Sequence, residues 1–86
     1  MPEISRFPGI VVTMYYNDHE PPHFHVRYGS QRARFAIDPV ELIDGNVGPR
    51  VRNLVLEWAG LHQAELQENW ARSRSDQPLQ SIAPLE

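Results

Sequence analysis

In one short stretch of this chain, histidine or arginine occupies alternate positions on each side of a central loop: His23, His25 and Arg27 before it, and Arg32 and Arg34 after it. Gly29-Ser30, in the middle of the stretch, is a two-residue loop of the kind that suits a type II′ turn between paired strands. Because side chains alternate between the faces of a strand, one face of this hairpin carries His23, His25, Arg27, Arg32 and Arg34. Imidazole exchanges protons near neutral pH, and guanidinium binds phosphate oxygens in pairs. The spacing therefore predicts a cationic surface suited to RNA or another anionic ligand.

The short loop also fixes which of these side chains face each other. It pairs Arg27 with Arg32 and His25 with Arg34, and like charges directly opposite destabilise a sheet by a few tenths of a kcal/mol to about 1 kcal/mol. No Asp or Glu falls on this face before Asp38, although the chain has a formal net charge of −3. An anionic ligand would relieve the repulsion. Since nonspecific nucleic-acid binders are usually basic overall, any such role must come from this local patch.

A histidine among arginines is also the arrangement that metal-free ribonuclease chemistry requires. One group takes the proton of the 2′-OH, and cations stabilise the charge that develops on the phosphate. On this hypothesis His25 and His23 are the catalytic residues, and the ligand-binding residues are Arg27, Arg32 and Arg34 together with Tyr15, which could stack a base or orient a phosphate. Whether the protein is an enzyme stays open. The simpler alternative is that these side chains are the solvated half of an amphipathic hairpin.

The His-x-His spacing is in addition a common half-site for zinc, copper or nickel. His19 or Asp18, in the preceding loop, could supply a third ligand, whereas Arg27 and Arg34 would repel a dication. We therefore assign no metal ligand and no cofactor from the sequence. Transition-metal binding through His23 and His25 remains an alternative.

The elements that would position these residues belong to one α+β domain spanning residues 1–86. A small antiparallel sheet of three or four strands is expected to pack against one long or kinked C-terminal helix, followed by an extended C-terminal tail. The expected strands cover residues 9–16, 23–28 and 32–38, with a short fourth at 40–43, and the expected helix runs from Arg50 to about Ser73. Gly60 predicts a kink or break in that helix.

Composition narrows the class of protein further. The 86 residues include no cysteine, which excludes disulfides, thiolate metal sites and cysteine nucleophiles. The N-terminal residues lack the plan of a signal peptide, and no apolar run reaches the length of a membrane span. We therefore expect a cytoplasmic protein without a membrane partner.

Several motifs resemble one family. The chain is similar to the bacterial domain of unknown function 4160 family. The residues that carry this resemblance are Met1-Pro2-Glu3-Ile4-Ser5-Arg6-Phe7, Tyr15-Tyr16-Asn17-Asp18-His19, Pro21-Pro22-His23-Phe24-His25-Val26, Leu54-Val55-Leu56-Glu57-Trp58-Ala59, His62, and Glu65-Leu66 with Asn69-Trp70. Its members look like parts of two-gene modules, often encoded beside a domain of unknown function 2442 protein, in the manner of toxin–antitoxin pairs. The resemblance implies a small cognate protein partner, and it carries no established catalytic residue.

Two roles remain open at this point. The chain could be a toxin-like component that acts on RNA, or a non-catalytic protein-binding, antitoxin or regulatory module. A solvent-facing apolar patch around Trp70, Leu79 and Ile82 would favour the second role. A two-fold homodimer is also possible, and it would bring two cationic faces together or bury them.

Overall fold

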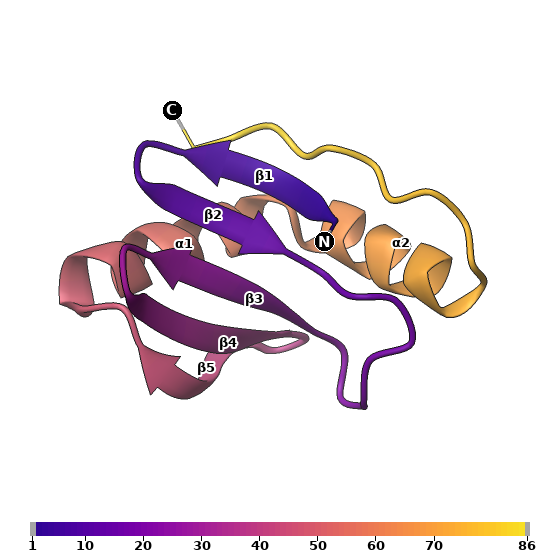
Figure 1. Ribbon diagram of the computed structural model, residues 1–86, viewed down its shortest axis with the longest axis horizontal. Helices are drawn as coiled ribbons and strands as arrows, with labels where there is room; N and C mark the ends of the chain where they lie inside the picture. Colours follow the sequence, from indigo (N-terminus) through magenta and orange to yellow (C-terminus); the bar gives the residue numbers. More distant parts are fainter. Residues whose placement is uncertain (1, 86) are drawn as a thin grey trace.

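The computed structural model describes residues 2–85 as a five-stranded antiparallel meander with two helices on one face (Figure 1). The strands lie in chain order across the sheet, and each pairs with its neighbour in sequence. The elements are β1 (Glu3–Phe7), β2 (Ile10–Thr13), β3 (His23–Tyr28), β4 (Gln31–Ile37), β5 (Val40–Asn46), α1 (Pro49–Leu61) and α2 (Gln63–Arg74). The α+β class predicted from the sequence is therefore confirmed, with more elements than expected.

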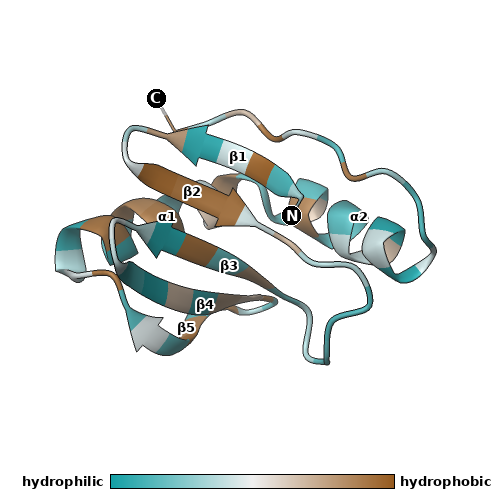
Figure 2. Cartoon of the chain, in the orientation of Figure 1, coloured by the Kyte–Doolittle hydropathy of each residue, from teal (hydrophilic) through white to brown (hydrophobic). Residues whose placement is uncertain are grey.

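The central hairpin has the predicted register. Arg27 pairs with Arg32 and His25 with Arg34 across a two-residue loop. Gly29 has a φ of 61°. Only the first loop residue has a positive φ, as a type II′ turn requires. Polar and apolar residues alternate along much of β3 and β4 (Figure 2), and Phe24, Val26, Ala33 and Phe35 are buried where Arg27 and Arg32 are exposed.

The sheet has two features that the sequence did not reveal. The first strand, Glu3–Phe7, precedes the strand that was expected at residues 9–16, which itself shortens to Ile10–Thr13. Pro8-Gly9 forms the turn between them, with Gly9 at a φ of 77°. The fourth expected strand lengthens to Val40–Asn46. The prediction of three or four strands was therefore too low.

The single long helix is also two helices, because the chain breaks beside Gly60. α1 ends at Leu61, and His62 leaves helical geometry with a φ of −117° and a ψ of 26° before α2 begins at Gln63. Glycine weakens a helix interior by about 1 kcal/mol relative to alanine, which favours a break at this point. Among the described residues, no helix has both the length and the apolar character needed to cross a bilayer.

The core lies between the sheet and the helices. Trp58 of α1 is fully buried, and its ring lies 5.6 Å from that of Phe7 and 5.8 Å from that of Phe24. Phe24 stacks on Phe35 across the hairpin at 5.6 Å. Burying one such side chain contributes roughly 1.5–3 kcal/mol. This packing holds β3 and β4 flat against α1 and turns their polar side chains outward.

The C-terminal tail is extended, as predicted, and runs beside β1 (Figure 1). The backbone N–H of Ile82 donates to the carbonyl of Ile4 at 2.7 Å. Asn69, 1% exposed, donates to the carbonyl of Gln80 at 2.9 Å and accepts from its N–H at 2.8 Å. Trp70 and Ile82 are buried under this arrangement. The solvent-facing patch that would have marked a docking helix and tail is thus absent around these two residues.

Candidate functional site

The open face of the sheet, opposite the helices, contains a hollow of about 310 Å³. It extends over β2, β3, β4 and β5, and strand alternation brings its polar side chains to this side of the sheet. The lining residues are Val11, Thr13, Tyr15, His25, Val26, Arg27, Arg32, Ala33, Arg34, Asp44 and Gly45. All five of Tyr15, His25, Arg27, Arg32 and Arg34 therefore lie around one depression.

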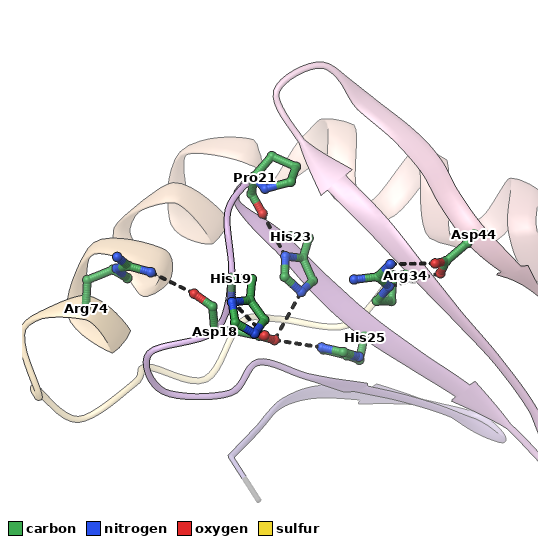
Figure 3. Close-up of polar contacts among 8 residues, drawn as sticks. All are labelled: Asp18, His19, Pro21, His23, His25, Arg34, Asp44 and Arg74. Atoms are coloured by element: carbon green, nitrogen blue, oxygen red, sulfur yellow. Dashed lines mark hydrogen bonds and ion pairs between the residues drawn. The ribbon is translucent and has the colours of Figure 1, made fainter.

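Two histidines converge on one carboxylate at the end of this hollow (Figure 3). Nε2 of His23 and Nε2 of His25 each lie 3.0 Å from Oδ2 of Asp18, which comes from the loop between β2 and β3. The side chains of His23, Asp18 and His25 are 2%, 22% and 29% exposed. We call Asp18, His23 and His25 the Asp–His cluster.

The loop that carries Asp18 is fixed to the end of α2. The guanidinium of Arg74 donates to the backbone carbonyl of Asp18 at 2.7 Å, and the N–H of Asn17 donates to the carbonyl of Ser73 at 3.3 Å. The ring of Trp70 covers that of His23, with the two centroids 5.4 Å apart. His23 is buried for this reason, although its position in the strand predicted a place on the solvated face.

The hydrogen bonds of His23 define where its ring proton lies. Nδ1 is 2.7 Å from the carbonyl oxygen of Pro21. A carbonyl oxygen can only accept, so Nδ1 of His23 must carry the hydrogen. Nε2 of the same ring then faces the Asp18 carboxylate. His25 also contacts the edge of the Tyr15 ring, with centroids 4.6 Å apart.

The Asp–His cluster keeps its carboxylate ionised. Partial burial opposes ionisation of Asp18. The hydrogen bond from His25, that from the N–H of His19, and the charges of the two histidines together overcome this effect and lower the pKa of Asp18. Asp18 therefore places an ionised carboxylate beside the cationic hollow.

A second acid reaches the hollow from β5. Arg34 forms a two-pronged ion pair with Asp44, its Nε donating to Oδ1 at 3.0 Å. The hydrogen bond from Arg34 is the main reason that the pKa of Asp44 is lowered. Acidic side chains therefore reach this face from outside the hairpin: Asp18 from the preceding loop and Asp44 from β5.

A β-bulge explains why Asp44 was missed. β4 and β5 pair regularly from Ile37 with Val40 to Phe35 with Leu42, and the register then shifts so that Arg34 faces Asp44. Without that shift Asp44 would lie opposite Ala33, on the helix side of the sheet. Gly45 has a φ of 90° beside the bulge, and a Cβ there would lie 2.4 Å from the carbonyl oxygen of Arg32. Apart from Gly45, no local feature of the sequence indicates the bulge.

The structure therefore separates the predicted site residues into two groups. Tyr15, His25 and the three arginines share the hollow, whereas His23 is buried beside it and belongs to the Asp–His cluster alone. Asp18 had been considered only as a third metal ligand. It lies three positions before Pro21 in the sequence, which does not reveal how close its carboxylate comes to both rings.

Fold and site define this molecule as a small α+β protein with a meander sheet, one face under two helices and the other open and polar. No curated protein and no solved structure matches the chain. Residues 9–71 match the family described as Domain of unknown function (DUF4160). The chain belongs to that family, as its motifs predicted.

Proposed function

We propose that the protein binds single-stranded RNA through the open face of its sheet, as the RNA-directed component of a toxin–antitoxin-like pair of small proteins. The observation that carries this proposal is the single hollow in which Tyr15, His25 and three arginines meet. Its volume of about 310 Å³ lies at the lower end of the range for small-ligand sites. That is room for one nucleotide-sized group, with the rest of a strand lying along the surface.

Two of the arginines are available to bind an anionic ligand. Arg27 and Arg32 are exposed and face each other across the hairpin. Within residues 2–85, no carboxylate forms an ion pair with either of them. Their mutual repulsion is relieved by a phosphate between them, which both guanidinium groups can bind through paired oxygens.

Tyr15 supports RNA as the anion. Its ring lies at the edge of the hollow against His25 and is partly exposed. Bases of single-stranded RNA stack on aromatic side chains, at about 1–3 kcal/mol per base, while arginines follow the backbone. Tyr15 and the Arg27–Arg32 pair supply these two kinds of contact on one surface.

Of the two histidines considered as catalytic residues of a ribonuclease, His25 is the candidate that the hollow retains. His23 is 2% exposed and lies outside the hollow, so His25 is the one histidine that lines it. Its Nε2 is already engaged by Asp18. We therefore propose binding, and metal-independent cleavage is tested separately by incubating RNA with the protein in EDTA. Cleavage that disappears in His25→Ala would establish the endoribonuclease.

Fluorescence anisotropy with a short labelled single-stranded RNA tests the binding proposal. Each phosphate contact adds about 0.7 to the slope of log affinity against log salt for a single strand. The double variant Arg27→Ala/Arg32→Ala should lower that slope by about 1.4 and weaken binding at low salt. Arg52→Ala, which removes an exposed arginine of α1 away from the hollow, is the matched control and should bind as the wild type does. Equal RNA affinity for the double variant would refute the proposal.

Induced expression in bacteria tests the toxin–antitoxin part of the proposal. Growth arrest by the wild type, relieved by the same double variant at equal expression, would indicate a toxin that acts through the open face. Unaffected growth would favour the antitoxin or regulatory alternative. Co-expression with the domain of unknown function 2442 protein of the same module would then show whether the two proteins co-purify.

A further inference from the structure

We propose that Asp18, His23 and His25 bind one divalent first-row transition-metal ion at the end of the open face (Figure 3). One carboxylate oxygen and two imidazole nitrogens, one from each residue, all lie within 4.8 Å of one another. This inference goes beyond the proposed RNA binding, with which it shares His25 alone. It is tested by metal binding rather than by RNA.

The distances within the Asp–His cluster suit a shared ion. Bonds from zinc to imidazole nitrogen and carboxylate oxygen are about 2.0–2.2 Å long, so that two donors at the tetrahedral angle lie about 3.3–3.6 Å apart. Nε2 of His23 and Nε2 of His25 already lie 3.0 Å from Oδ2 of Asp18. The backbone already brings the three donors within 4.8 Å of one another, and an ion would require the two imidazoles to rotate toward it.

His23 is oriented as a metal ligand would be. Its Nδ1–H donates to the carbonyl of Pro21 at 2.7 Å. That hydrogen bond leaves Nε2 as the ring nitrogen directed at the carboxylate of Asp18, 3.0 Å away, where it can serve as the metal-binding atom. Metal-binding histidines commonly donate their other ring N–H to a backbone carbonyl in this way.

The donor set selects the class of ion. Two imidazole nitrogens and one carboxylate suit zinc, iron(II), cobalt or nickel, whereas magnesium and calcium prefer oxygen donors. Three protein ligands leave at least one coordination position for water or another ligand. Because His25 also lines the hollow, that position lies next to the open face.

The arginines of the hairpin do not oppose a cation here as strongly as the sequence suggested. The charge of Arg34 is balanced by its ion pair with Asp44. Arg74 approaches Asp18 through the backbone carbonyl. The carboxylate of Asp18 therefore remains directed at the two histidines.

Isothermal titration calorimetry of the full chain with ZnCl₂, after removal of any affinity tag and of EDTA, tests the site. The wild type should bind one Zn²⁺ per chain. His25→Ala and Asp18→Asn each remove one ligand and should weaken binding by more than the roughly 10–100-fold typical of lost outer-shell contacts. Both replaced side chains are partly exposed, so the variants should fold, which circular dichroism and thermal melting would verify.

The chain offers a matched control in His62, which pairs with Glu65 on α2, where residues 2–85 supply no third metal-binding side chain. His62→Ala should leave Zn²⁺ affinity unchanged. With Co²⁺ as the probe, the wild type and His62→Ala should show visible absorption bands that His25→Ala lacks. Absence of binding heat with folded wild type, or equal Zn²⁺ affinity in folded His25→Ala and Asp18→Asn, would overturn the assignment. A loss of affinity in His62→Ala alone would overturn it as well.

Discussion

Replacing Asn69 by alanine tests how the C-terminal tail is held. Asn69 is 1% exposed and makes two hydrogen bonds, of 2.8 and 2.9 Å, to the backbone of Gln80. Each such bond contributes about 1 kcal/mol net, and the variant also loses buried side-chain contacts. We therefore expect Asn69→Ala to lower the free energy of unfolding by roughly 2–3 kcal/mol.

That loss is large for a domain of this size. At roughly 0.05–0.15 kcal/mol per residue, a chain of 86 residues has a total stability of about 4–13 kcal/mol. A change of 1 kcal/mol shifts the melting temperature of such a domain by about 4–8 °C, so Asn69→Ala should melt roughly 10–20 °C lower. Urea unfolding followed by the fluorescence of the buried Trp58 and Trp70 measures the change directly.

The control is Gln80→Ala, because both hydrogen bonds of Asn69 are made to backbone atoms of Gln80. This variant retains both hydrogen bonds, and its stability should lie within about 0.5 kcal/mol of the wild type. Hydrogen exchange at the N–H of Ile82, which bonds to Ile4, should accelerate in Asn69→Ala alone. Equal stabilities of Asn69→Ala and wild type, or an equal loss in Gln80→Ala, would refute the reasoning.

Three further predictions concern β5. Gly45→Ala should destabilise the fold by roughly 1–3 kcal/mol, since the residue has a φ of 90° and a Cβ would meet the Arg32 carbonyl. Thermal melting would show this loss. The control is Gly60→Ala, because a Cβ at Gly60 would lie in open space. Asp44→Asn should strengthen RNA binding several-fold in anisotropy because it frees Arg34, and unchanged affinity would contradict this. The Asp44 carboxyl should titrate by NMR below its ordinary pKa of 3.8, so its ion pair stabilises the fold above that pH and is lost as the pH falls through the lowered pKa. Arg34→Ala should return that pKa toward 3.8, and an unmoved titration would contradict the assignment.

The parts of this structure that the sequence predicted are those determined by local geometry. The Gly29-Ser30 loop and strand alternation were enough to obtain the register of β3 with β4 and the residues on each face. Gly60 predicted the break between the helices.

What the sequence did not predict depends on contacts between distant segments. The shift in register between β4 and β5 moves Asp44 to the opposite face, and strand alternation alone gives the wrong side. Asp18 reaches the histidines because Arg74, 56 positions away, holds its loop. The burial of His23 likewise depends on Trp70 of α2. Patterns over a few residues contain no information about these distances.

The two edges of the sheet differ in what they offer to a second molecule. The C-terminal tail lies along the outer side of β1, whereas no strand among residues 2–85 pairs with the outer side of β5, where Leu42 and Ile43 are 38% and 37% exposed. Sheets with two open edges can add copies without limit, as fibrils do. A sheet with one open edge can pair once, edge to edge about a two-fold axis, and then has no edge left. Growth of this sheet by strand addition therefore ends at two chains for as long as the tail stays in place.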